Sequence, residues 1–342
     1  MTKNFHSDII DVRGDDYSRG VTVGRLFRRA IRRAVRHADK NTAKTAILQR
    51  IATNIKNNFP YIHEEVRGRA DGAGVAYLDF LGLACYELDD VKTEHCTTIM
   101  VNTKHHFFLA HNEDGDYHRN DVHLVQNFFT NGNQFYELAC MGSLATNTIR
   151  VGHDFIYTTN YVGFADYNFD YLPRTLFMRV LAECKTVEEL IATFRTTPLA
   201  SATHVNLVDF KNKKMYSMEK ALDKASIKEI NGTYIHANHL IHEPLLGLRP
   251  PLHLERGNTH QRQYAADVLL NGRKDLTIAE AKDILTYYNT NDFNSVFCKM
   301  NCGNDCLTFG TYIFDPAHNA NLIEIYCPAN KQTSATSAFS NL

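Results

Sequence analysis

The chain has 342 residues, of which 44% are hydrophobic and 22% charged, and its formal net charge is −1. A chain of this length and composition can bury a sizeable core and is not intrinsically disordered. The near-neutral charge provides no overall field that would favour nucleic acid or an anionic membrane surface.

The first 95 residues are predicted to be mainly helical. Apolar residues recur at helical spacing from Leu26 to Val35, and further helices are expected over 47–55, 62–70 and 78–88. The other positions of the first helix hold six arginines, namely Arg25, Arg28, Arg29, Arg32, Arg33 and Arg36. This helix could grip phosphate, but no aromatic stacking platform follows it, so a solvated face is the favoured interpretation.

After Cys96 the pattern changes to short strands. They are expected over 97–102, 106–111, 122–129 and 134–140, and two helices follow over 173–183 and 186–196. The remaining strands are expected over 204–209, 214–219, 225–230, 234–238, 307–314 and 323–327, with helices over 259–270 and 278–288.

This order of elements predicts a single α+β domain over residues 1–342. Many antiparallel strands interrupted by pairs of helices favour two stacked sheets with helices outside. The sequence shows no internal repeat and no low-complexity linker that would divide the chain.

The cytoplasm is the expected compartment. The N-terminus has no apolar core typical of a secretory signal, and the longest apolar stretch, near 75–86, contains Asp79 and is too short to span a bilayer. The terminal Ser340-Asn341-Leu342 is a weak relative of the peroxisomal Ser-Lys-Leu signal, so a peroxisome is the alternative.

Eight cysteines are then expected to be reduced. Cys298, Cys302 and Cys306 repeat at intervals of four, but no second ligand pair of the kind found in structural zinc sites follows them. We therefore expect no metal and no cofactor.

Cys96 is the residue around which the candidate chemistry gathers. A free thiol is mostly protonated at neutral pH, so a nucleophilic cysteine needs a base. A main-chain amine has a pKa of about 7.7–8.0, which suits a base working near pH 7. If the chain cuts itself between His95 and Cys96, the freed amine lies beside the sulfur of the same residue.

Self-cleavage would proceed by attack of the sulfur on the preceding carbonyl, an N→S acyl shift and hydrolysis of the thioester. It predicts a fragment 1–95 and a fragment 96–342 that stay associated. Thr97 and Thr98 can position the chain at the cleavage site through their hydroxyls. Asp114, eighteen residues after Cys96 in an expected Asn-x-Asp turn, can orient the amine, and Asn238 offers a side-chain NH₂ to an oxyanion.

The order of these motifs resembles the acyl-coenzyme A:6-aminopenicillanic acid acyltransferase family, autoproteolytic cysteine members of the N-terminal nucleophile hydrolases. Cys96-Thr97-Thr98 matches the cleavage motif, and His111-Asn112-Glu113-Asp114 matches the family's Asn-x-Asp motif at the same distance from the cysteine. Asp16–Gly20 with Gly24, Ala70–Val75 and His236–His239 are similar to further segments of the family.

The resemblance implies a four-layer αββα sandwich. It also implies that Cys96 is the nucleophile, that Asp114 assists its amine, and that Asn238 lines the oxyanion hole with support from Thr98 and Asn112. The His-Asn-Glu-Asp motif is closer to members that hydrolyse β-alanyl amides, and polar residues beside Asp114 argue against an aryl-acetyl pocket. His95 departs from the glycine that often precedes the family cysteine.

The leading hypothesis is a self-processing enzyme that forms an acyl-enzyme at Cys96. It would hydrolyse a small linear amide or transfer the acyl group to an amine, and the sequence leans towards hydrolysis. An acyl-CoA or thioester-dependent N-acyltransferase of secondary metabolism is the alternative.

Two further hypotheses remain open. An unprocessed Cys–His hydrolase would use a base such as His111 or His239. A binding protein would use the Arg25–Arg36 helix for nucleic acid or acidic partners. The expected partner in the leading hypothesis is a small acyl-amide or acyl-thioester substrate, with no nucleic acid, no membrane and a homo-oligomer as an option.

Overall fold

The computed structural model describes residues 10–38, 41–89, 95–116, 123–141, 144, 148–151, 154–248, 259–289, 295–298, 306–315, 320–327 and 332–337. Cys302 and the terminal Ser340-Asn341-Leu342 lie outside these residues. Among the described helices, none has both the length and the apolar character needed to cross a lipid bilayer.

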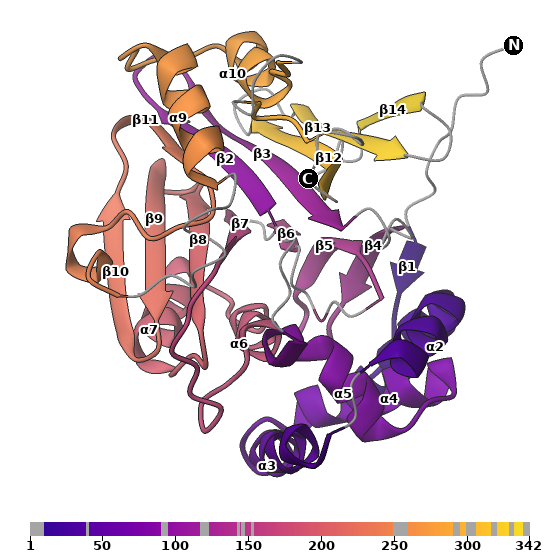
Figure 1. The fold of residues 1–342 in the computed structure, drawn as a ribbon. Helices are drawn as coiled ribbons and strands as arrows, with labels where there is room; N and C mark the ends of the chain where they lie inside the picture. Colours follow the sequence, from indigo (N-terminus) through magenta and orange to yellow (C-terminus); the bar gives the residue numbers. More distant parts are fainter. Residues whose placement is uncertain are drawn as a thin grey trace, which may run out of the picture.

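Two β-sheets lie face to face, and helices cover the outer face of each (Figure 1). The first sheet has eight strands in the order β1-β4-β5-β6-β7-β8-β9-β10, and the second has six in the order β11-β2-β3-β12-β13-β14. The predicted α+β class and the four-layer αββα arrangement are thereby confirmed.

The strands of the eight-stranded sheet are β1 (Ile10–Val12), β4 (His123–Phe128), β5 (Gln134–Ala139), β6 (Thr148–Val151), β7 (Phe155–Val162), β8 (Ala202–Asp209), β9 (Lys214–Ala221) and β10 (Lys224–Glu229). Those of the six-stranded sheet are β2 (His95–Asn102), β3 (Phe107–Asp116), β11 (Gly232–His236), β12 (Cys306–Asp315), β13 (Ala320–Cys327) and β14 (Gln332–Ser337).

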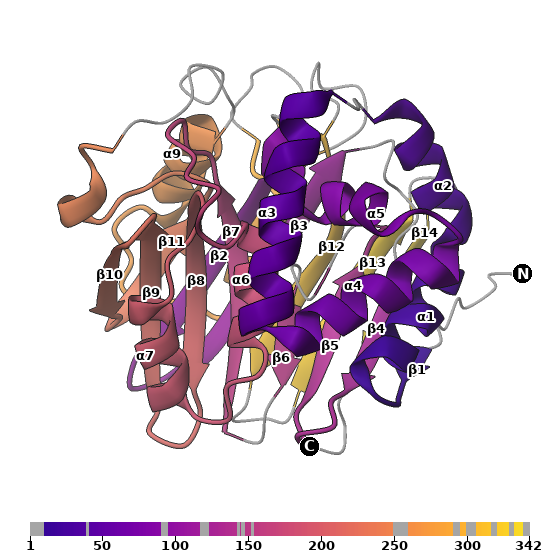
Figure 2. The same cartoon turned by 90° about the horizontal axis from the view of Figure 1, so that it is seen from below.

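The helices before Cys96 are α1 (Asp16–Leu26), α2 (Arg28–His37), α3 (Thr42–Asn58), α4 (Pro60–Ala73), α5 (Tyr77–Ala84) and the 3₁₀ turn η1 (Tyr86–Asp89). Those after it are α6 (Arg174–Leu181), α7 (Val187–Thr196), the 3₁₀ turn η3 (Glu243–Leu245), α9 (Thr259–Leu270) and α10 (Ile278–Leu285). Figure 2 shows α3, α4, α6 and α7 lying across the eight-stranded sheet, away from the second sheet.

Three apolar clusters hold the four layers together. The largest joins the N-terminal helices, α6 and α7 to the outer face of the first sheet, with Phe80, Tyr157 and Leu176 fully buried. A second cluster fills the space between the sheets and includes Met100 and Leu109. The third packs α9 and α10 on the outer face of the second sheet. Strands β2 and β3 therefore have one face towards the first sheet and one towards α9 and α10.

Local sequence signals explain where several helices begin and end. The side chain of Asp15 accepts a hydrogen bond from the backbone of Ser18 at the start of α1, at 2.7 Å. Pro60 occupies the first turn of α4, and Gly74 ends it in the left-handed conformation with φ +68°. The side chain of Thr186 caps α7 by accepting a hydrogen bond from Glu189 N at 3.1 Å.

The arginine-rich helix α2 uses two of its arginines within the fold. The Nε atoms of Arg28 and Arg32 donate to the carbonyl oxygen of Ala73, at 3.4 and 2.7 Å. These bonds satisfy an end carbonyl of α4, where a helix carries partial negative charge. This pair of arginines therefore has a structural role that needs no external phosphate.

The predicted strands omitted β1, β6, β7 and β14. Strand β7 is the most important of these because it lies in the middle of the first sheet, and all eight of its residues are buried. Helices cover one face of β7 and the second sheet covers the other, so its sequence has no polar-apolar alternation. Because both faces of β7 are covered, polar residues of this strand such as Asn160 are buried as well.

Candidate active site

Cys96 lies near the start of β2, between β11 and β3. It is 4% exposed. Antiparallel pairing places Cys96 opposite Glu113 and Thr98 opposite His111, and the alternation of a strand directs these four side chains to one face. That face is the one turned towards the first sheet, because the next residues of this row, Met100 and Leu109, belong to the cluster between the sheets.

The segment 111–114 is therefore strand, and the predicted Asn-x-Asp turn is wrong. Residues 107–116 form the continuous strand β3, paired with β2 on one side and β12 on the other. Polar residues that would favour a turn in isolation are held extended because both strand edges are hydrogen-bonded. As a result, consecutive residues of the motif point to opposite faces of the sheet.

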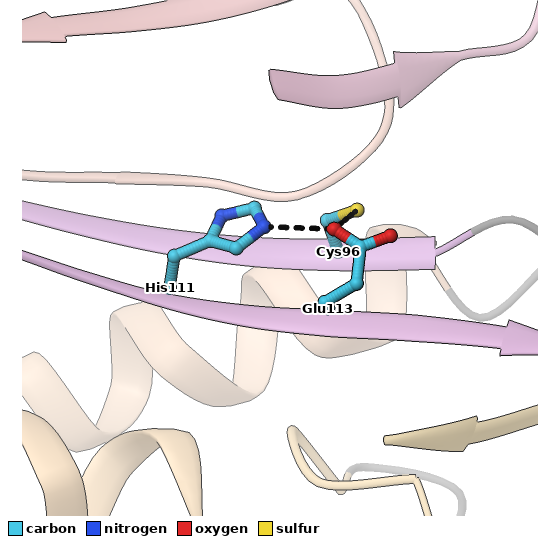
Figure 3. A group of neighbouring side chains, drawn as sticks. All are labelled: Cys96, His111 and Glu113. Atoms are coloured by element: carbon cyan, nitrogen blue, oxygen red, sulfur yellow. Dashed lines mark hydrogen bonds and ion pairs between the residues drawn. The ribbon is translucent and has the colours of Figure 1, made fainter. Parts of the chain in front are cut away.

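The sulfur of Cys96 lies beside a carboxyl group and an imidazole (Figure 3). Cys96 Sγ donates to Glu113 Oε2 across 3.8 Å, and Glu113 Oε2 lies 3.2 Å from His111 Nε2. Burial lowers the pKa of His111 to about 3. Burial and the charge of Asp114 raise the pKa of Glu113 well above its usual range. Both groups are thus held neutral.

A second row of polar side chains fixes the orientation of the imidazole. Thr98 Oγ1 donates to Asn160 Oδ1 at 2.9 Å and accepts from Asn206 Nδ2 at 3.1 Å. Its remaining lone pair faces His111 Nδ1 at 2.7 Å. Because a hydroxyl has one proton, Thr98 accepts from His111 Nδ1–H, and the Nε2 lone pair is directed at Glu113.

The backbone nitrogen of Cys96 has its own acceptor. It donates to Asn238 Oδ1 at 2.8 Å, while Asn238 Nδ2 donates to the carbonyl of Tyr161 at 2.8 Å. The structure therefore brings the candidate site residue Asn238 to the nitrogen of Cys96. Its NH₂ group, however, is hydrogen-bonded to Tyr161, so action as an oxyanion donor would require that bond to open.

Arg262, on α9, ties these groups together from the other face of β2. Its Nη1 donates to the Cys96 carbonyl at 2.7 Å and to Thr97 Oγ1 at 2.8 Å, and its Nη2 donates to Asn238 Oδ1 at 2.5 Å. The side chain is fully buried. A planar guanidinium can donate in these directions at once, so it fixes the position of Cys96 relative to Asn238.

Asp114 lies opposite His95 in the pairing of β2 with β3, on the Arg262 side of the sheet. Its Oδ1 accepts from Thr308 Oγ1 at 2.6 Å, and its Oδ2 lies 4.0 Å from Arg262 Nη1. Within the described part of the chain, Oδ2 has no hydrogen-bond partner although it is buried. Burial raises the pKa of Asp114 against the opposing effect of Arg262.

The predicted supporting residues divide between the two faces. Thr98 belongs to the sulfur face, as described above. Thr97 and Asn112 belong to the α9–α10 face, where Asn112 donates to the Leu285 carbonyl at 2.8 Å and accepts from Thr311 Oγ1 at 2.7 Å. Asn112 therefore anchors β3 to α10 and β12, whereas Thr98 orients His111.

Sequence reasoning did not include Glu113, Arg262, Asn160 or Asn206 in the candidate site. The spacing of His111 and Glu113, two residues apart, would have placed them on one strand face had the segment been assigned as strand. Arg262, Asn160 and Asn206 lie in segments whose local sequence gives no sign that they belong to the site.

His239 is the other base considered for an unprocessed hydrolase. Its Nδ1 lies 3.0 Å from Thr259 Oγ1.

Comparisons with known proteins agree with the motif resemblance. The acyl-coenzyme A:6-aminopenicillanic acid acyl-transferase family profile matches residues 101–252, a segment that begins just after Cys96 and contains Asp114 and Asn238. No curated protein matches the chain. One similar solved structure is the Caenorhabditis elegans orthologue of N-acylethanolamine-hydrolyzing acid amidase, at TM-score 0.44 and 15% identity, covering 65% of this chain and 93% of that one.

The family match points to an enzyme of the hydrolase or acyltransferase type. It extends over somewhat less than half of the chain, from β2 to the segment after η3. Over residues 101–252 the chain is thus similar to the acyl-coenzyme A:6-aminopenicillanic acid acyl-transferase family.

Proposed function

We propose that the chain cuts itself between His95 and Cys96 and that the new N-terminal cysteine then acts as the nucleophile on a small linear amide. The observation that carries this proposal is the separate placement of the two reactive atoms of Cys96. Its nitrogen lies 2.8 Å from Asn238 Oδ1, and its sulfur lies 3.8 Å from Glu113 Oε2.

The cleavage step needs a route for the thiol proton. Glu113 takes this proton as it passes its own to Nε2 of His111, and the sulfur attacks the carbonyl carbon of His95. The C–N bond breaks and a C–S bond forms. The proton removed from sulfur ends on the nitrogen of Cys96, and water then hydrolyses the thioester to free the thiol.

After cleavage, the amine of Cys96 would stay in place through Asn238 Oδ1. The second acceptor for the amine would be Asp114 Oδ2, which is buried and has no hydrogen-bond partner within the described residues. A buried acceptor of this kind is rare in a folded protein unless a group arrives to use it. Asp114 thus keeps the role predicted from the sequence, that of orienting the liberated amine.

The mature site would then take the acyl group of the substrate onto Cys96 and release it to water. The polar surroundings of the sulfur, formed by Glu113, His111 and Thr98, favour a polar acyl or amine group and favour hydrolysis over transfer. An acyl thioester donor with an amine acceptor is the alternative, because both reactions pass through the same acyl-enzyme.

Denaturing electrophoresis with N-terminal sequencing tests self-cleavage. The expected fragments are 1–95 and 96–342, the larger beginning Cys-Thr-Thr. Cys96→Ala should give one intact, inactive chain, and cleavage of that variant at the same bond would exclude this sulfur as the nucleophile. Cys140→Ala, which removes a different thiol, is the control and should be cleaved normally.

A second candidate function rests on the same cluster. Cys96, Glu113 and His111 are already connected in the uncleaved chain, as an unprocessed cysteine hydrolase would require. Glu113, rather than His111, would then be the group next to the sulfur. This candidate predicts full activity from an unbroken chain, whereas the first predicts that activity appears only with the fragments.

A further inference from the structure

We propose that Cys96, His111 and Glu113 bind a Zn²⁺ ion in the uncleaved chain and that the bound ion prevents self-cleavage. The second half of this proposal rests on the proposed function, whereas the first half stands on the geometry of three side chains. One sulfur, one nitrogen and one oxygen of these residues lie within 4.8 Å of one another.

The separations of these atoms suit a tetrahedral zinc ion. Ordinary zinc–ligand bond lengths place nitrogen and oxygen ligands about 3.4 Å apart and sulfur and oxygen ligands about 3.6 Å apart. The observed separations are 3.2 Å for His111 Nε2 to Glu113 Oε2 and 3.8 Å for Cys96 Sγ to Glu113 Oε2. The third edge, from the sulfur to the imidazole nitrogen, lies within 4.8 Å.

The charges of the three ligands balance the ion. A thiolate and a carboxylate contribute two negative charges, and a neutral imidazole contributes none. Binding would release the thiol proton and the Glu113 proton to solvent. A thiolate favours zinc over magnesium or calcium, and the carboxylate makes the set less suitable for copper(I), so zinc is the ion we propose.

The surroundings already hold the imidazole as a metal ligand. A zinc-bound histidine usually donates its second ring N–H to a fixed acceptor, which sets the tautomer. Here that acceptor is Thr98 Oγ1, itself held by Asn160 and Asn206. The Nε2 lone pair therefore points to the position that the ion would take.

A fourth position would remain for water, as in zinc sites with three protein ligands. Tyr312, the cross-strand neighbour of His111 on β12, stacks on the imidazole with ring centroids 5.9 Å apart. Among the described residues its hydroxyl is buried without a hydrogen-bond partner. A metal-bound water would supply a partner in this polar site.

The consequence for cleavage follows from the chemistry of the sulfur. A zinc-bound thiolate has its lone pair engaged, and Glu113 and His111 can no longer carry the proton away from Cys96. Removal of zinc restores both functions. Zinc would thus keep the precursor intact until the metal is lost.

Cobalt(II) is the probe for the metal site, because a thiolate–cobalt bond gives a charge-transfer absorption. We expect this band, at one ion per chain, in the intact full chain synthesised in the presence of cobalt(II), so that the metal meets the site before cleavage. Cys96→Ala should abolish the band, and Cys140→Ala should retain it. Thr98→Val should retain the band but weaken affinity by about 10–100-fold, the usual effect of removing a group that orients a ligand. Absence of the band, or its survival in Cys96→Ala, would overturn the site.

Cell-free synthesis of the full chain tests the inhibition. With a chelator we expect cleavage into 1–95 and 96–342, and with Zn²⁺ we expect the intact chain. A Cys96-dependent cobalt band with cleavage unaffected by zinc would overturn the inhibitory role. A cobalt band in a chain that never cleaves, with or without the chelator, would leave the metal site standing and refute the proposed function instead.

Discussion

At the scale of single residues, the site is organised by which face of β2 and β3 each side chain occupies. Adjacent residues Glu113 and Asp114 belong to different environments, one beside the sulfur and one beside Arg262. Both carboxyl groups have a raised pKa because both are buried. The different surroundings of these two neighbouring carboxyl groups thus follow from strand alternation.

Arg262 is the residue on which the position of Cys96 depends most. In Arg262→Lys the charge near Asp114 is kept, but the planar fork that holds the Cys96 carbonyl and Asn238 is lost. We expect self-cleavage to slow and kcat of the cleaved enzyme to fall by about 100-fold, because a small displacement of reacting groups lowers the rate by this order. Gel densitometry and steady-state kinetics measure the two effects.

Arg273→Lys is the matched control for this substitution. Arg273 lies on the surface just after α9, where it pairs with Glu280 while its side chain is 41% exposed. An exposed ion pair contributes little to the stability of the fold, so the cleavage rate and kcat of Arg273→Lys should stay near those of the unsubstituted chain. Equal behaviour of the two variants would show that Arg262 does not position the nucleophile.

At the scale of elements, the close packing of helices α1 and α4 is the main feature of the N-terminal helical layer. Helices α1 and α4 approach through Gly20 and Gly24 on one side and Gly68 and Gly72 on the other. A Cβ atom on Gly68 would lie 2.1 Å from the backbone oxygen of Tyr17, a contact that only a shift of a whole helix could relieve. Glycine is required there by the distance between the two backbones.

Gly68→Ala should therefore destabilise the fold. We expect its free energy of unfolding to fall by about 1–3 kcal/mol, the usual effect of overpacking a core. Urea unfolding in the Cys96→Ala background, which should remain one chain, gives the measurement. Gly82→Ala is the control, because its Cβ would meet only the flexible end of Leu48 at 3.3 Å, and a change below about 1 kcal/mol is expected. Similar losses in both variants would argue against the close crossing.

At the scale of the whole molecule, several buried histidines make the fold sensitive to acid. Burial lowers the pKa of His242 to about 4 and that of His239 to about 3, and it lowers the pKa of His204 well below the usual range. These three side chains titrate near pH 6.5 once unfolded. Since the unfolded state binds more protons, stability is present above about pH 6.5 and is lost as the pH falls towards 4.

The unfolding midpoint in urea should thus be lower at pH 5 than at pH 7. His242→Gln removes one titrating group while keeping polar atoms near Ser217 and Ser226, which His242 contacts at 2.9 and 3.0 Å. All chains carry Cys96→Ala so that they remain uncut. We expect the urea midpoint of the His242→Gln variant to fall less between pH 7 and pH 5 than that of the Cys96→Ala parent. His105→Gln, at an exposed position, should leave the difference unchanged. An equal loss in all three chains would rule out His242 as a contributor.

The sequence by itself determined the fold class, the order of most elements and the position of the nucleophile candidate. Periodicity and turn residues predicted the helices before Cys96 and the strands after it, because these signals act over a few neighbouring residues. The motif order indicated a resemblance to the family, and it singled out Asn238 as a candidate site residue from a segment far along the chain.

Only the tertiary structure decided which polar groups meet the sulfur. Whether residues 111–114 form a turn or a strand depends on pairing with β2 and β12, which no local pattern contains. That pairing places Glu113 rather than Asp114 next to Cys96. The packing of β7, β8 and α9 against the two faces of β2 brings Asn160, Asn206 and Arg262 to it. The physical reason is that strand pairing and burial on both faces override local propensity.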